Sequence, residues 1–138
     1  MKRIQFLLAA IVVAMMSSCL HKTEAVVDVE VKQKGEPLSG VTVYKFKDNG
    51  LGEGSTLFKK NASGSEKTNA GGVAHFKLKS PDDFTPSDVS MVEGKETNTF
   101  FFCTYDKNDE RNSIVTVAVK TGDHKTVQLE VPEGLVNP

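Results

Sequence analysis

The amino-acid sequence predicts an all-β fold, an antiparallel β-sandwich of about seven short strands with one short helix. Apolar and polar residues alternate with a period of two in several short segments, which is typical of half-buried strands. Glycine, proline and asparagine separate these segments at close spacing, as they do in turns. The alternating valines and phenylalanines would fill the space between two aligned sheets.

The first predicted strand is 27–32, in which valine fills every second position. Gly35-Glu36-Pro37 then forms a turn. The second strand is 41–46, and it carries apolar residues on both faces. Its two faces consist of Val41, Val43 and Lys45 on one side and Thr42, Tyr44 and Phe46 on the other.

Residues 48–66 are polar and rich in glycine, and only Leu57-Phe58 interrupts them, as a candidate short edge strand. A long loop on a compact domain is usually functional or disordered, and both alternatives stay open here. A turn at 69–72 leads into a strand at 73–78. In that strand His75 faces outward, because Ala74, Phe76 and Leu78 occupy the core positions.

Residues 80–97 break the strand pattern and predict the one short helix. Thr85 can cap it, Pro86 suits its first position, Asp88 can close a capping box, and Gly94 would end it. Three more strands follow at 98–105, 114–119 and 126–131. A charged hairpin connection at 106–112 joins the first two of these.

The N-terminus indicates export. Met1, Lys2 and Arg3 precede an apolar run at 4–16 that is too short for a membrane-spanning helix. Met16-Ser17-Ser18-Cys19 resembles the bacterial lipobox, with Met in place of the more usual Leu. The resemblance implies cleavage before Cys19, lipid on its thiol and anchoring in a membrane. Leu20 in place of an aspartate implies the outer membrane of a Gram-negative bacterium.

The chain then divides into a signal peptide (1–18), a lipidated cysteine and tether (19–24), a β-sandwich domain (25–132) and a loose tail (133–138). The mature chain has 120 residues, enough for one domain, with 15 basic and 18 acidic residues. This balance indicates no nucleic-acid partner. With Cys19 modified, Cys103 has no disulfide partner, and its apolar neighbours indicate a buried structural thiol.

Part of the sequence resembles a known family, in addition to showing the alternation of strands. Two segments together resemble a pattern of carboxypeptidase-regulatory-like and transthyretin-like (prealbumin-like) sandwich domains. They are Gly35-Glu36-Pro37-Leu38-Ser39-Gly40-Val41-Thr42-Val43 and Lys67-Thr68-Asn69-Ala70-Gly71-Gly72-Val73-Ala74-His75-Phe76. The resemblance covers roughly 25–131 and implies an Ig-like or prealbumin-like sandwich. It also implies a non-catalytic module for binding, spacing or assembly. Adhesin repeats that share the pattern carry a Lys–Asn isopeptide crosslink, but the last strand here has no Asn, so we expect no such bond.

Two further functional classes compete with a binding module. A structural subunit of an envelope or appendage assembly is the main alternative. A hydrolase is less favoured: His75 and His124 with Asp123 are the best acid–base or metal candidates, but no zinc spacing, nucleophile elbow or phosphate loop accompanies them. The aspartates of 82–88 lack the spacing of a calcium loop and indicate a solvated acidic loop. We therefore expect no enzyme activity, no metal and no cofactor.

For a binding module, the working surface would lie on the loops of a rigid sandwich, and the partner would be a protein, a glycan or a small ligand. The apolar loop residues that are candidates for partner contact are Phe58, Phe84 and Met91. The alternative for each is a residue that folds down onto the core as part of a lid.

Overall fold

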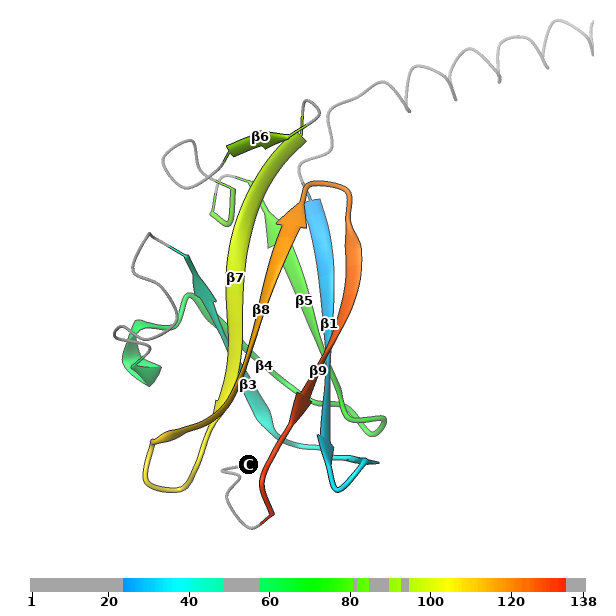
Figure 1. The fold of residues 1–138 in the computed structure, drawn as a ribbon, viewed down its shortest axis with the longest axis vertical. Helices are drawn as coiled ribbons and strands as arrows, with labels where there is room; N and C mark the ends of the chain where they lie inside the picture. Colours follow the sequence, from blue (N-terminus) through cyan, green and yellow to red (C-terminus); the bar gives the residue numbers. More distant parts are fainter. Residues whose placement is uncertain (1–23, 49–57, 81, 85–89, 93–94, 134–138) are drawn as a thin grey trace, which may run out of the picture.

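The computed structural model describes residues 24–48, 58–80, 82–84, 90–92 and 95–133. These residues form two packed β-sheets (Figure 1). The elements are β1 (Glu24–Gln33), β2 (Glu36–Pro37), β3 (Thr42–Lys47), the 3-10 helix η1 (Lys59–Asn61), β4 (Gly64–Lys67), β5 (Val73–Lys79), β6 (Ser90–Val92), β7 (Lys95–Tyr105), β8 (Arg111–Lys120) and β9 (His124–Glu130). The six strands that the alternation predicts are confirmed.

The first sheet has β1 at its centre. Strand β5 pairs antiparallel with β1 from Glu24↔Lys79 to Glu30↔Val73. Strand β9 pairs with the other edge of β1 in the parallel sense, and β2 forms a small hairpin with the end of β1. The predicted sandwich is confirmed, but it is not purely antiparallel. A parallel pair needs a long connection, and here the rest of the domain provides it between the first and last strands.

The second sheet has β7 at its centre. Strand β8 pairs along almost the whole of one edge, and β3 and β6 share the other edge. Strand β4 extends the sheet beyond β3. We did not predict β4, because its sequence Gly-Ser-Glu-Lys is polar and carries no apolar alternation. It is a strand because its backbone completes hydrogen bonds with β3.

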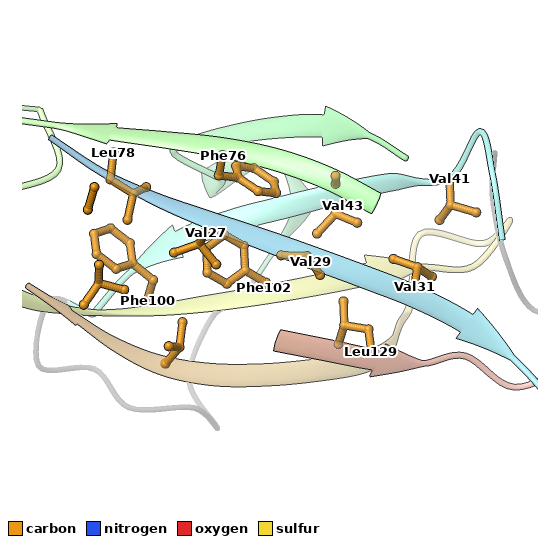
Figure 2. Close-up of a cluster of buried hydrophobic side chains, with 14 of the residues drawn as sticks. Val27, Val29, Val31, Val41, Val43, Phe76, Leu78, Phe100, Phe102 and Leu129 are labelled. Carbon is orange, nitrogen blue, oxygen red and sulfur yellow. The ribbon is translucent and has the colours of Figure 1, made fainter. Parts of the chain in front are cut away.

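The main core lies between the two sheets, where the inward side chains of both meet (Figure 2). It contains Ala25, Val27, Val29, Val31, Val41, Val43, Ala74, Phe76, Leu78, Phe84, Phe100, Phe102, Val117, Val119, Leu129 and Val131. The rings of Phe76 and Phe102 approach to 4.9 Å between centroids. Each fully buried valine or phenylalanine contributes about 1.5–3 kcal/mol relative to an exposed position.

A second apolar cluster lies on the outer face of the β7 sheet. Phe46, Phe101, Cys103 and Tyr105 are buried there, and Ala62 beside η1 packs against them. Strand β3 therefore has apolar residues on both faces, as predicted. The buried Cys103 thiol also agrees with the sequence, and burial raises its pKa to about 11.

The connection that follows β5 corrects two predictions. Asp83 is buried at 5% exposure, so this part of the acidic loop is not solvated. Its Oδ1 lies 2.6 Å from Nζ of Lys45, which points into the sandwich from β3, and its Oδ2 accepts a hydrogen bond from the backbone of Lys79. Asn98 donates to the Asp83 carbonyl oxygen. A lysine on the inner face of a strand needs a buried counter-charge, and Asp83 supplies it.

The predicted helix is wrong where the structure describes the segment. Ser90–Val92 is strand β6, which pairs with Lys95–Thr97 of β7. The backbone groups of β6 gain ladder hydrogen bonds from the extended start of β7, which outweighs a weak local capping signal. The expected cap at 85–88 lies outside the described residues.

Candidate functional site

Three strands of the β1 sheet bring a carboxylate and two histidines together on the outer face. Asp28 of β1 lies opposite His75 of β5, and His124 begins β9 beside Val26. Val27 and Val29, on either side of Asp28, point inward, so Asp28 points away from the core by strand alternation. We refer to Asp28, His75 and His124 as the His–Asp–His cluster.

The carboxylate of Asp28 is shared by the two imidazole rings. His75 Nδ1 donates to Oδ1 at 2.5 Å, and His124 Nε2 donates to Oδ2 at 2.6 Å. An ionised carboxylate only accepts hydrogen bonds, so both ring nitrogens that face it carry a proton. The opposite nitrogen of His75, Nε2, lies 3.4 Å from the side-chain amide of Asn69.

The cluster stabilises the ionised form of Asp28. Its side chain is only 15% exposed, against 62% for His75 and 65% for His124. Burial alone would raise the pKa of Asp28. The hydrogen bonds and charges of His124 and His75 together outweigh burial, and the pKa of Asp28 lies below its ordinary value.

The cluster fits only part of the sequence hypothesis. His75 and His124 are indeed neighbours, but the carboxylate that joins them is Asp28. Asp123 instead accepts a hydrogen bond from the backbone of Lys120 and lies 3.9 Å from Nζ of Lys125. Sequence reasoning missed Asp28 because it resembles an ordinary solvated position of a strand, and only the parallel pairing of β1 with β9 brings His124 beside it.

The chemistry available to the cluster is limited. Within the described part of the chain, no group of three or more His, Cys, Asp or Glu residues is arranged to hold a metal ion. A carboxylate that binds two imidazoles orients them and holds their protons. The cluster also links three strands across the outer face of the sheet, so it contributes to the fold.

The three candidate contact residues have different environments. The side chain of Phe58 is 58% exposed, and among the described residues it is the large hydrophobic residue that lies at the surface. Phe84 is fully buried and packs on Phe100 at 5.9 Å between ring centroids, so of the two alternatives it follows the one in which the residue folds onto the core, not the one of partner contact. The backbone of Met91 lies in β6, but its side chain is outside the description. Cys19 also lies outside the described residues.

The surroundings of Phe58 form a small surface patch on the β7 sheet. The next residue, Lys59, pairs with Asp109 of the β7–β8 hairpin at 2.9 Å, and its Nζ lies 5.5 Å from the ring centroid of Tyr44. The hydrogen bond to Asp109 raises the pKa of Lys59. We refer to Phe58, Lys59, Tyr44 and Asp109 as the Phe58 patch. Its exposed ring belongs to the residue that directly precedes the lysine of the Lys59–Asp109 pair.

Comparisons with known proteins give no family. No family model matches the chain, and no curated protein matches it. No helix within the described residues is both long enough and apolar enough to cross a membrane.

Solved structures with a similar fold include a DUF3823 family protein from Parabacteroides merdae (18% identity, TM-score 0.44, 80% of this chain and 46% of that one). The Bacillus anthracis TIE protein is similar at 11% identity with a TM-score of 0.45, over 80% of this chain and 16% of that one. The SpaB basal pilin from Lactobacillus rhamnosus GG is similar at 13% identity with a TM-score of 0.48, over 79% of this chain and 97% of that one. This chain spans less than half the length of the first two. Similarities at this level carry no conclusion about activity.

Proposed function

We propose that the protein is a lipoprotein of the bacterial envelope whose β-sandwich is a non-catalytic module for binding or scaffolding. The observation that carries the proposal is the lipobox-like Met16-Ser17-Ser18-Cys19 directly ahead of the folded domain. Strand β1 begins at Glu24, so only four residues, 20–23, separate the cysteine from the sandwich. Lipid on Cys19 would therefore hold the domain close to the membrane, and the outer membrane of a Gram-negative bacterium is the location that Leu20 favours.

A binding role accords with how the surface is built. The His–Asp–His cluster lies on the outer face of a sheet, and its shared carboxylate is already occupied by two hydrogen bonds. The Phe58 patch offers an exposed aromatic ring next to charges, and aromatic residues of this kind are enriched at protein interfaces. The resemblance to carboxypeptidase-regulatory-like and transthyretin-like domains implies the same class of function. The partner is a protein or a glycan.

Mass spectrometry of the detergent-extracted protein tests the anchor. We expect a mature chain that begins at Cys19 and carries acyl groups on it. The matched control is Cys19→Ser, which should remain uncleaved or appear without lipid. A wild-type protein released into the soluble fraction without lipid would contradict the proposal.

Self-association would indicate the alternative, a structural subunit of an envelope assembly. Strand β4 pairs only with β3 among the described strands, so its outer edge is the candidate for pairing with another chain. That edge is short and carries Glu66 and Lys67, which discourage pairing. Sedimentation of the domain over a range of concentrations separates the two functions, and we expect a constant monomer mass.

A further inference from the structure

The point where the chain enters the sandwich fixes which end of the domain lies nearest a membrane anchor. Strand β1 begins at Glu24, and two other segments meet it there. The Gly122 backbone donates to the Glu24 carbonyl at 2.7 Å, and Lys79 pairs with Glu24 in the sheet register. This end, which we call the entry end, thus contains the start of β1, the end of β5 and the β8–β9 turn (Figure 1).

Three turns lie at the opposite end, which we call the far end. They are the β1–β2 turn at Lys34–Gly35, the turn at 69–72 and the β7–β8 hairpin at 106–110. Val31, near the end of β1, donates to the carbonyl of Gly72, which places the first two turns side by side. Strand β8 runs from the hairpin back to the entry end, so the hairpin belongs to the far end.

Chain lengths then set the geometry. Five residue steps from Cys19 to Glu24 span at most about 17 Å when fully extended. The ten residues of β1 span about 33 Å at the rise of a strand. The tether is therefore about half as long as the domain, and the entry end stays within reach of the lipid while the far end lies a full strand length beyond it.

We propose that the entry end faces the lipid surface and that the far end, with the Phe58 patch beside it, is directed away from the membrane. This proposal rests on the proposed lipid anchor. The Lys59–Asp109 pair joins the patch to the β7–β8 hairpin, so the exposed ring of Phe58 lies toward the far half of the domain. A partner protein would meet the sandwich at this end without competing with the lipid headgroups.

Charge supports the same orientation. The β7–β8 hairpin carries Asp106, Asp109 and Glu110 beside Lys107 and Arg111, and near the β1–β2 turn Glu36 and Glu133 lie beside Lys34, which pairs with Glu133 at 2.7 Å, so acidic residues outnumber basic ones. Anionic lipids attract basic protein surfaces, and they do not attract an end in which acidic residues predominate. Electrostatic attraction therefore does not draw the far end toward the bilayer.

Fluorescence quenching in vesicles tests the orientation. The full-length lipidated protein is reconstituted in phosphatidylethanolamine–phosphatidylglycerol vesicles that contain a headgroup nitroxide lipid. Single labels are placed at Lys79→Cys on the entry end and Asn108→Cys on the far end, both exposed positions. The parent protein is the unlabelled control, because lipid occupies the Cys19 thiol and Cys103 is buried.

We expect strong quenching of the label at position 79 and little or none at position 108. Equal quenching would show that the domain lies on its side, and stronger quenching at position 108 would reverse the orientation, so either result overturns the proposal. A mass spectrum of the same sample separates the two hypotheses. Acylated protein with equal quenching refutes only the orientation, whereas protein without lipid refutes the anchor and the orientation together.

Discussion

The buried ion pair between Lys45 and Asp83 gives the sharpest prediction of stability. Asp83→Asn keeps an oxygen that can accept the Lys79 backbone hydrogen bond but removes the charge that faces Lys45, whose side chain is 9% exposed. Removing one partner of a buried pair costs about 3–5 kcal/mol, because the other charge stays buried and uncompensated. We expect a loss within this range, because the one amide oxygen accepts the Lys79 hydrogen bond and the amide NH2 group, itself a donor, then faces the ammonium group.

The double variant Lys45→Met with Asp83→Asn removes both charges and should recover most of that loss. Neither residue then buries an uncompensated charge, so we expect the double variant to be closer in stability to the wild type than Asp83→Asn is. Urea denaturation of the wild type, Lys45→Met, Asp83→Asn and the double variant, followed by circular dichroism, gives the coupling energy directly. The exposed pair Lys79–Glu24, 3.9 Å apart, is the matched control, and Lys79→Met should leave stability unchanged. A double variant whose loss of stability equals the sum of the two single-variant losses would refute the reasoning.

Four further perturbations test other parts of the structure. Gly72→Ala should cost about 1–3 kcal/mol in urea denaturation, because φ is +77° and the new Cβ would lie 2.9 Å from the Leu38 backbone nitrogen. Native Cys103 should not react with a thiol reagent at pH 8, because burial raises its pKa to about 11, and it should react fully in urea. Asp28 has a lowered folded pKa, so its contribution to stability is present above its unfolded value of 3.8 and is lost as pH falls through the folded value. Asp28→Asn should therefore flatten the acid limb of the Tm-against-pH curve. Phe58→Ala should change stability by less than about 0.5 kcal/mol, whereas Phe84→Ala should cost about 3–5 kcal/mol; equal losses in thermal melts would contradict the surface role of Phe58.

Local alternation predicts most of the strands because burial in a sandwich repeats every second residue. The valines of β1 and the apolar residues of β5 have no other low-energy placement, and strand 41–46 shows both of its apolar faces in the sequence. The correction at Asp83 arises from contacts that are distant in sequence, with Lys45 of β3 and Asn98 of β7. The correction at Ser90–Val92 is local, because this strand pairs with Lys95–Thr97 as a short hairpin, and the capping pattern at 85–88 directed the prediction to a helix instead.

The Lys45–Asp83 pair could in part have been anticipated. The pattern of 41–46 places Lys45 on the same face as Val41 and Val43, and an inward lysine implies a buried acid somewhere in the chain. The sequence contains 18 acidic residues, and nothing local distinguishes Asp83 from its neighbour Asp82. The His–Asp–His cluster is harder still, since it needs the parallel register of β1 with β9 as well as the outward direction of three side chains.

The two sheets differ in how many faces they bury, and this difference determines where a partner can bind. The β7 sheet buries its inner face and part of its outer face, because Ala62 and its neighbours cover Phe46 and Phe101 on the outside, whereas Thr116 and Ala118 of β8 are exposed. The β1 sheet buries one face and exposes polar residues on the other. Apolar contact with a partner is thus available at the covering segment, where Phe58 lies, and charged contact at the Asp28 face. A partner that loses affinity with Phe58→Ala but not with Asp28→Asn binds the covering segment, and the opposite result would move the interface to the β1 sheet.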